Sequence, residues 1–452
     1  MQSILVCSLL AAGAFSAPTP ATSPSQKVPL PKRAAFARST GTLDTTAYLA
    51  NLNHTIQKYS GKSLRSYGIS AKHKRQSAKE ALTDQISNGE DELYYGPGSV
   101  GAESGFTFDF DTGSADTFIP GPSCGTAQGC VGTVKYGNNG TDEGNTTSIT
   151  YGSGSVQGEN YYDSVTVAGL TAKHQNVISL TQAAGFSSSN ANSLMGMGFQ
   201  AIAASGQPPY FKTLIDQKQV TTQEFSFYLG RAAGEFPAPM IDKSNIKNGT
   251  GAKSEMTLGG RDTSKFTGTP VQVAVSTPGY WQIPLDGVKV NAIEDLVDQI
   301  ADKGQAAIDT GTTIILAPLL AATTIFARIP GAIPVPLALL GGAVEPILYI
   351  YPCAMSPNVS ITFGGTDFAI DPRDFNLGQL TPDFGTLVGN ATLASVLKKT
   401  AYCVAAIAAF DIQPAENLYV VGDTFLKNWY SIYSYNAANG SPAVSFAKSV
   451  SV

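Results

Sequence analysis

Two copies of one short acidic motif are the residues of this 452-residue chain best suited to chemistry. Residues 111–114 read Asp-Thr-Gly-Ser, and residues 309–312 read Asp-Thr-Gly-Thr, each after an apolar run typical of a strand. A carboxylate at the end of a buried strand loses solvation, and glycine lets another backbone segment approach closely. Two such carboxylates face to face, about 3 Å apart, cannot both ionise, so the pair would share one proton and offer an acid and a base together.

Histidine is too scarce for the other common hydrolytic sites. The chain has 3 His, at His54, His73 and His174, and the first two fall in a region that we expect to be removed. A Ser-His-Asp triad, a Cys-His pair or a histidine-ligated zinc site would have to be built on His174 alone. Carboxylates remain as the catalytic groups, and we expect neither a metal nor another cofactor.

Residues 1–17 predict a secretory signal peptide, because they form an apolar run that ends in small residues. Cleavage between Ala14 and Ala17 would remove Cys7 and leave four cysteines, an even number that suits disulfides in an oxidising compartment. Their spacing does not suit zinc. They fall into two local pairs: Cys124 with Cys130, and Cys353 with Cys403.

The net charge of −5 is distributed unevenly along the chain. Residues 18–75 hold ten Lys or Arg against one acid and carry +9, whereas residues 76–452 hold 19 basic and 33 acidic residues and carry −14. A basic block can bind nucleic acid or an anionic membrane, but in a secreted chain we favour a prosegment that covers an acidic body. Residues 72–75 (Lys-His-Lys-Arg) end the block in a dibasic processing site, so we expect the mature chain to begin near Gln76.

Two further features favour a secreted protein. The most apolar later stretch, residues 312–351, is interrupted by five prolines and two charged residues, which argues against a membrane-spanning helix after the signal. Five sequons in the predicted mature chain favour a glycosylated surface: Asn139, Asn145, Asn248, Asn358 and Asn390. We expect the protein to reach the extracellular space or, alternatively, an acidic vacuole, and to bind no nucleic acid.

The elements that must position the two aspartates read mostly as strands. Three runs alternate apolar and polar side chains and predict half-buried strands: 106–110, 164–167 and 271–275. Helical patterns are few and short: 209–217, 319–327 and 394–399. Each acidic motif is followed much later by two apolar residues and a glycine, at 194–196 and 420–422. The sequence therefore predicts a mostly β protein built from two similar lobes.

Taken together, these motifs show that the chain resembles the pepsin-like aspartic endopeptidases. The resemblance covers nearly the whole chain and includes residues 149–154 (Ile-Thr-Tyr-Gly-Ser-Gly), Tyr280-Trp281 and residues 422–426 (Gly-Asp-Thr-Phe-Leu). It implies a bilobal fold with a pseudo-two-fold axis between the lobes, here residues 76–270 and 271–452. A central cleft between the lobes would bind an extended polypeptide substrate. The implied function is that of a monomeric acid endopeptidase, made as a zymogen, that hydrolyses internal peptide bonds.

The resemblance implies a role for every residue of the repeated motif. Asp111 and Asp309 would form the catalytic dyad, with one carboxylate taking a proton from water while the other protonates the scissile carbonyl. Ser114 and Thr312 would donate hydrogen bonds to the outer oxygens of these aspartates. The other motif residues would support the dyad, with the two threonine hydroxyls linking the active-site loops: Thr112, Gly113, Thr310 and Gly311.

Two further segments would control access to the dyad. The family's mobile flap would bind the substrate backbone and exclude water through three residues: Tyr151, Gly152 and Ser153. Residues 57–59 (Gln-Lys-Tyr) resemble the prosegment motif, in which Lys58 would lie against the catalytic carboxylates and Tyr59 would block the cleft. Lys62 is the alternative to Lys58. Protonation of the acidic body at low pH would release the basic prosegment.

The chain departs from the family pattern in details. The turn at residues 101–105 is one residue shorter than usual, and residues 192–193 (Asn-Ser) replace Asp-Gly. Phe118 stands where tryptophan is usual, so no ring nitrogen can hydrogen-bond to Tyr151 and we expect a freer flap. Residues 331–351 read as an apolar elaboration of the second lobe.

Two other functions stay open at this point. A catalytically impaired homologue could act as a secreted binding or inhibitor protein, although the intact dyad and its hydroxyl partners argue against it. A carboxylate-pair glycosidase would also use two acids without histidine. The two matched motifs and the presence of only 2 Trp for sugar stacking argue against that class.

Overall fold

The computed structural model describes the following parts of the chain: residues 42–60, 78–81, 83–87, 90–151, 154–184, 191–230, 254–290, 293–294, 304–337, 345–412, 415, 417–437 and 440–450. The predicted signal peptide, the dibasic site at residues 72–75 and the flap residues 152–153 lie outside them. The described residues form mainly β-strands with short helices, which confirms the predicted fold class. The division into residues 76–270 and 271–452 stays a prediction.

The first half of the chain forms an eight-stranded sheet, with strand order β2-β3-β4-β9-β5-β8-β7-β6. β4 ends at Asp111 and runs parallel to β9, so that Asp111 lies opposite Gly196. β5 is antiparallel to β9 and parallel to β8. The strand bounds are as follows: β2 Thr83–Ser87, β3 Glu90–Val100, β4 Glu103–Asp111, β5 Thr117–Pro120, β6 Thr141–Tyr151, β7 Gly154–Val167, β8 Leu170–Ala184 and β9 Ser193–Gly196.

The second half repeats this arrangement in a sheet of order β13-β16-β24-β17-β23-β19-β18, with β22 paired to β23. β16 leads into Asp309 and runs parallel to β24, and Ile308 lies opposite Val421. β17 is antiparallel to β24 and parallel to β23, as β5 is to β9 and β8. The bounds are as follows: β13 Gln282–Leu285, β16 Gly304–Ile308, β17 Ile315–Ala317, β18 Ile333–Pro336, β19 Ile347–Pro352, β22 Asn376–Gln379, β23 Tyr402–Ala409 and β24 Leu418–Val421.

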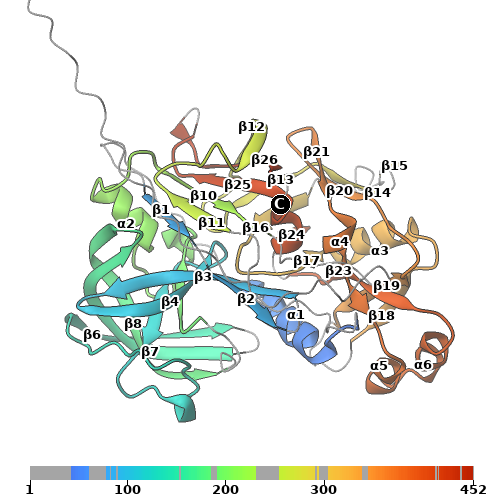
Figure 1. Ribbon diagram of the computed structural model, residues 1–452, viewed down its shortest axis with the longest axis horizontal. Coiled ribbons are helices and arrows are strands. Elements are labelled where there is room, and N and C mark those ends of the chain that lie inside the picture. The colour runs from blue at the N-terminus through green and yellow to red at the C-terminus, as the bar shows by residue number, and fades with distance from the viewer. Residues whose placement is uncertain are drawn as a thin grey trace, which may run out of the picture.

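A six-stranded sheet joins the two halves, because its order β1-β11-β10-β25-β26-β12 mixes strands from both (Figure 1). A smaller sheet of order β15-β14-β20-β21 belongs to the second half. The bounds of the first are β1 Ala78–Ala81, β10 Glu224–Tyr228, β11 Glu255–Leu258, β12 Phe266–Ala274, β25 Trp429–Ser434 and β26 Ala443–Ser449. Those of the second are β14 Gly287–Val290, β15 Ile293–Glu294, β20 Val359–Phe363 and β21 Thr366–Ile370.

The helices are short and lie around the sheets. The patterns at 209–217 and 319–327 correctly predict α2 and α3. The third prediction, 394–399, is displaced, because the Asn390 side chain accepts a hydrogen bond from the Leu393 N–H and starts α6 earlier. The helices are α1 Thr45–Tyr59, α2 Tyr210–Asp216, α3 Leu319–Ala327, α4 Pro372–Phe375, α5 Pro382–Leu387, α6 Ala391–Leu397 and α7 Asp423–Leu426, with 3-10 turns at Thr126–Gln128 and Gln200–Ile202.

Helix α1 comes from the predicted prosegment and lies between the two halves of the chain, at the bottom centre of Figure 1. Asp44 caps its first turn by accepting hydrogen bonds from the backbone N–H groups of Thr46 and Ala47. Its apolar side chains are buried against the second half, in a cluster with side chains from β17, β19, β23 and β24. The prosegment helix is therefore packed as part of the folded protein.

Two disulfides join the predicted pairs, Cys124 with Cys130 and Cys353 with Cys403. They close loops of very different length, with sequence separations of 6 and 50. In the chain-entropy model the long loop contributes roughly 4 kcal/mol to the free energy of unfolding and the short one roughly 2 kcal/mol. We therefore expect paired Cys→Ala replacement of Cys353 and Cys403 to cost about twice as much stability, measured by urea unfolding, and equal costs would contradict the loop argument.

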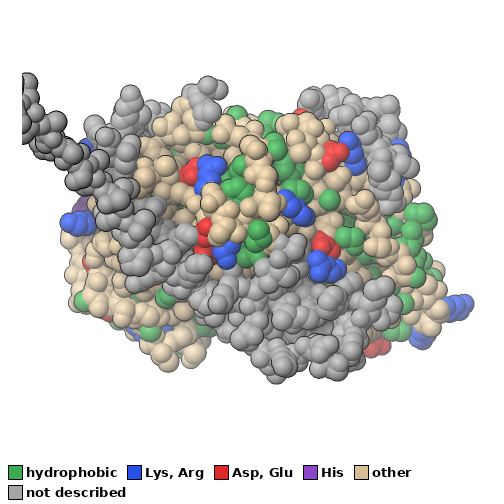
Figure 2. Space-filling view, turned by 45° about the horizontal axis from the view of Figure 1, so that its top comes forward, with side chains coloured by type: hydrophobic (Ala, Val, Ile, Leu, Met, Phe, Trp, Pro, Cys, Tyr) green, Lys and Arg blue, Asp and Glu red, His purple; other side chains and the backbone are tan. Residues whose placement is uncertain are grey.

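Charges of both signs are mixed on one face of the described surface. Figure 2 shows Lys or Arg side chains lying next to Asp or Glu side chains on the face drawn, so that neither sign gathers into one patch among the coloured residues there. Among the described residues, no helix combines the length and the apolar character needed to cross a membrane.

Candidate active site

The two repeated aspartates occupy equivalent positions at the ends of equivalent strands. Asp111 is the last residue of β4 and Asp309 directly follows β16, and both side chains are almost completely buried. The Gly113 N–H donates to Asp111 Oδ1 at 2.8 Å, and the Gly311 N–H donates to Asp309 Oδ1 at 2.9 Å. The tight turn after each strand therefore aims a backbone donor at one oxygen of each carboxylate.

A hydroxyl binds the second oxygen of each carboxylate. Ser114 Oγ donates to Asp111 Oδ2 at 2.5 Å, and Thr312 Oγ1 donates to Asp309 Oδ2 at 2.5 Å. Hydrogen bonds to the charged form stabilise a carboxylate that burial would otherwise disfavour. Each aspartate thus receives one donor from its own motif on each carboxylate oxygen.

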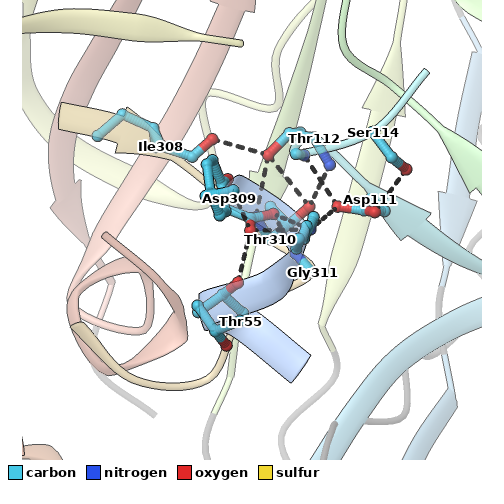
Figure 3. Close-up of polar contacts among 12 residues, drawn as sticks. Thr55, Asp111, Thr112, Ser114, Ile308, Asp309, Thr310 and Gly311 are labelled. Carbon is cyan, nitrogen blue, oxygen red and sulfur yellow. Dashed lines mark hydrogen bonds and ion pairs between the residues drawn. The ribbon is translucent and has the colours of Figure 1, made fainter. Parts of the chain in front are cut away.

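The two loops that carry the aspartates hold each other through their threonines, as Figure 3 shows. Thr112 Oγ1 accepts from the Thr310 N–H at 2.9 Å and donates to the Ile308 carbonyl at 2.9 Å. Thr310 Oγ1 accepts from the Thr112 N–H at 3.1 Å and donates to the Phe110 carbonyl at 2.7 Å. Each hydroxyl thus joins the two halves of the chain, and the cross-linked loops fix the position of one aspartate relative to the other.

Each motif's glycine lies against the aspartate of the other motif. A Cβ atom on Gly311 would stand 2.2 Å from Asp111 Oδ1, and one on Gly113 would stand 2.6 Å from Asp309 Oδ1. No real Cβ atom tolerates such a distance, so only glycine permits the two carboxylates to lie this close to the opposite loop. This close approach is the structural reason for a glycine at the third position of each motif.

Lys58 of α1 lies between the two aspartates. Its Nζ is 2.7 Å from Asp111 Oδ1, and 3.0 Å and 2.9 Å from the Oδ1 and Oδ2 atoms of Asp309. The lysine is fully buried, so its charge is compensated by this carboxylate pair rather than by water. Lys62, the alternative, lies outside the described residues.

Tyr59 covers the dyad next to the lysine. Its hydroxyl donates to Asp309 Oδ2 at 2.9 Å, and its ring lies 4.7 Å from the ring of Tyr280. Burial, together with the negative charge of Asp309, raises the pKa of Tyr59 well above its usual range, so the phenol remains a hydrogen-bond donor. The end of α1 therefore fills the space above both carboxylates.

The predicted flap falls on the hairpin between β6 and β7. Tyr151 pairs with Gly154 at the end of this hairpin, whereas Gly152 and Ser153, and the side chain of Tyr151, lie outside what the structure describes. Phe118 is buried beneath the hairpin in a cluster with Ile149 and other apolar side chains. The greater freedom expected for the flap stays a prediction.

Three polar residues that hold the site or the helix covering it were not identified from the sequence. Asp116 accepts hydrogen bonds from the backbone N–H groups of Ala204 and Ser205 and from the Ser205 hydroxyl, and so anchors the loop after β9 to the first motif. Asn51 of α1 donates to the Thr313 hydroxyl at 3.1 Å. Asp44 does carry a local signal, because an aspartate before a helical run is a common N-cap. The contacts of Asp116 and Asn51 link distant segments and have no such signal.

The departures at residues 101–105 and 192–193 are accommodated locally. Gly101 and Gly105 have φ values of +58° and +91°, which glycine adopts without strain, so the shortened turn still closes the β3–β4 hairpin. Asn192 exchanges two hydrogen bonds with Thr107 of β4, each 3.0 Å long. Within the described residues, no group of three or more His, Cys, Asp or Glu side chains is arranged to hold a metal ion.

Comparisons with known proteins agree with this site. The family model described as eukaryotic aspartyl protease matches residues 93–449. An aspartic protease of Phaffia rhodozyma is 34% identical over 383 residues, which cover 83% of this chain and 80% of that protein. Major aspartyl peptidase 1 of Cryptococcus neoformans is 30% identical over 391 residues (84% and 73%). A probable vacuolar protease A of Arthroderma benhamiae is 27% identical over 385 residues (80% and 82%).

Proposed function

The chain belongs to the family of eukaryotic aspartyl proteases and is an aspartic-type endopeptidase, and from this premise we propose that it is made as the zymogen of a secreted acid endopeptidase with Asp111 and Asp309 as its catalytic residues. One observation carries the proposal. A buried carboxylate pair, held by two hydroxyls and two backbone N–H groups, is covered by a lysine and a tyrosine of the N-terminal segment. The proposed substrate is an extended polypeptide, and the proposed active form is a monomer.

The proposed reaction needs one proton shared by the dyad and one water molecule. The ionised carboxylate takes a proton from the water, whose oxygen attacks the scissile carbonyl carbon. The protonated carboxylate gives its proton to the carbonyl oxygen, which produces a neutral gem-diol. Transfer of a proton to the amide nitrogen then breaks the C–N bond and releases an acid and an amine. The fixed donors on each aspartate hold both carboxylates in position throughout, so little reorganisation is required.

The proposed zymogen is kept inactive by Lys58 and Tyr59, which occupy the position of the water and the substrate. With the lysine between them both carboxylates can carry a negative charge, and their attraction for the lysine weakens when low pH protonates them. The same protonation weakens the attraction between the acidic body and the basic segment. Acid therefore releases the prosegment and exposes the dyad, which without the lysine holds the one shared proton that the reaction uses.

The proposed route is secretory, ending outside the cell or in an acidic vacuole. The two disulfides favour an oxidising compartment. The relative named as a probable vacuolar protease A supports the second destination.

A cleavage assay across pH tests the proposal. Purified zymogen is incubated with a denatured protein between pH 2 and pH 8, the range over which carboxylates titrate, and the new peptide termini are quantified. We expect internal cleavage at acid pH that fades toward neutrality. Activity confined to neutral pH would contradict the shared-proton mechanism, and absence of cleavage at every pH would favour the impaired homologue.

Gly311→Ala is expected to reduce kcat/KM by roughly 100-fold, because an added methyl group would displace Asp111 from its position by a large fraction of an ångström. The comparison variant is Gly287→Ala, at a glycine whose added Cβ would meet nothing within 4 Å. Steady-state kinetics on the matured proteins measures the effect. Equal activity in Gly311→Ala and wild type would show that the close approach of the loops is not needed for turnover.

A further inference from the structure

Helix α1 covers the two aspartates and also a larger apolar area of the second half of the chain. One buried apolar cluster contains Tyr59 and Tyr280 beside the aspartates and continues beneath Tyr48 and Leu52 of the helix. At its far end lie four side chains from the region of β22, α5 and α6, which we call the distal surface: Leu380, Phe384, Leu393 and Leu397. An uninterrupted apolar path therefore connects the proposed catalytic site to the α5–α6 hairpin, at the lower right of Figure 1.

The chain just before α1 shows what the distal surface accepts. Thr42 forms a parallel β-bridge with Gln379 at the end of β22. The Leu43 N–H donates to the Gln379 carbonyl at 2.7 Å, and the Leu43 side chain is buried in the same cluster as the distal surface. The occupant is thus a short extended backbone with one apolar side chain. This pattern, a main-chain hydrogen bond plus an apolar contact, is how sheet edges bind extended peptides.

The distal surface stands on a tightly packed support. Gly385 of α5 lies so close to α6 that an added Cβ would stand 2.3 Å from the Ala394 nitrogen. Asn390 caps α6 with a hydrogen bond from the Leu393 N–H at 2.9 Å. The contacts that hold α5 against α6 therefore involve no residue of the prosegment, and we expect the two helices to keep their arrangement when it leaves.

We propose that, after the prosegment leaves, the distal surface binds an apolar residue of the polypeptide substrate outside the catalytic cleft. This rests on the proposed function, since the prosegment must be removed. The 15 residues of α1 span about 22 Å at 1.5 Å per residue, whereas an extended chain covers about 3.3 Å per residue. The apolar residue should therefore lie about six or seven residues from the scissile bond. The substrate class is a long, unfolded polypeptide with a leucine-like residue at that spacing.

Peptide kinetics with the matured enzyme test the proposal. A short peptide carries only a cleavable core, and longer peptides add a leucine or a serine six or seven residues to either side of the scissile bond. We expect leucine on one side to lower KM roughly tenfold relative to serine, as burial of one leucine side chain would, with kcat unchanged. Equal KM values for leucine and serine on both sides would overturn the proposal.

Variants on α5 test whether the preference for leucine over serine arises at the distal surface. In Phe384→Ser the ratio of kcat/KM between the leucine and serine peptides should fall to about one. The matched control is Leu387→Ser on the same helix, whose side chain is exposed in the structure and should leave the ratio unchanged. An unchanged ratio in Phe384→Ser, or an equal loss in both variants, would contradict the assignment to the distal surface.

A competing peptide provides a test that needs no variant. A synthetic peptide of residues 42–51 should raise the KM of the leucine peptide toward that of the serine peptide and leave cleavage of the short peptide unchanged. Equal inhibition of both would place the peptide in the cleft and overturn the proposal. Light scattering that shows a dimer broken by Phe384→Ser would assign the surface to a second copy instead. Failure to cleave even the short peptide would reject the proposed function itself, separately from the distal surface.

Discussion

Asp111→Asn and Asp309→Asn are each expected to reduce peptide hydrolysis by roughly 10⁴-fold. Asparagine has nearly the same shape as aspartate but can neither take a proton from water nor carry the shared proton. Each carboxylate also receives a hydroxyl on its second oxygen, at 2.5 Å in both cases, and an amide NH₂ turned toward that hydroxyl cannot accept from it. Either replacement therefore removes one partner of the acid–base pair.

The measurement requires matured protein, because an inactive variant will not process itself. Each variant is cut at residues 72–75 with an added processing protease, and kcat/KM is then measured on one peptide across pH. Thermal unfolding shows whether the fold is intact. Asp367→Asn is the matched control, since Asp367 is exposed on β21 and pairs with Lys289 at 2.8 Å, and it should keep full activity. Substantial cleavage by either dyad variant would exclude the shared-proton mechanism.

Lys58→Ala is expected to make the zymogen convert at a pH higher by at least about one unit. The lysine is fully buried, and it is the ammonium group that contacts both carboxylates. Removing one partner of a buried ion pair costs about 3–5 kcal/mol, while one pH unit corresponds to about 1.4 kcal/mol. The lysine stabilises the docked prosegment only while the carboxylates are charged, so this contribution is present at higher pH and is lost as the pH falls and they are protonated.

Conversion is followed on gels after brief incubation at a series of pH values, and the midpoint is compared between variants. Lys62→Ala is the control, because Lys62 is the other lysine that could oppose the dyad and lies four residues further along the chain. We expect its midpoint to match that of wild type. An unchanged midpoint in Lys58→Ala, or a shift in Lys62→Ala of the same size, would show that Lys58 does not hold the prosegment.

Local sequence patterns predicted the elements that carry the site. The alternating runs at 106–110 and 164–167 lie within β4 and β7, and the run at 271–275 overlaps β12, which ends one residue earlier, at Ala274. The repeated motif predicted two similar arrangements, and the parallel pairings of β4 with β9 and of β16 with β24 confirm them. These predictions succeeded because strand alternation and an internal repeat are properties of residues close together in the chain. The predicted range of α6 was displaced, because its short apolar pattern did not indicate that the helix begins directly after the Asn390 cap.

Contacts between distant segments had no such signal. The packing of Asp116 against residues 204–205 joins positions almost ninety residues apart, and the hydrogen bond from Leu43 to the Gln379 carbonyl joins the prosegment to the second half. An aspartate at position 116 and a leucine at position 43 are both ordinary in the sequence, so no sequence pattern predicts either contact. Only the packed chain shows which polar groups face each other.

The sequence alone therefore determined the chemistry available to this protein: two aspartates in matched motifs, a shortage of histidine, two cysteine pairs and a basic segment before an acidic body. The tertiary structure decided how these groups meet. It places the dyad at two strand ends, cross-links the loops through Thr112 and Thr310 and inserts Lys58 between the carboxylates. The physical reason is that residue type determines which bonds and charges a side chain can offer, whereas burial and distance, which determine their strength, arise only when segments far apart in the chain pack together.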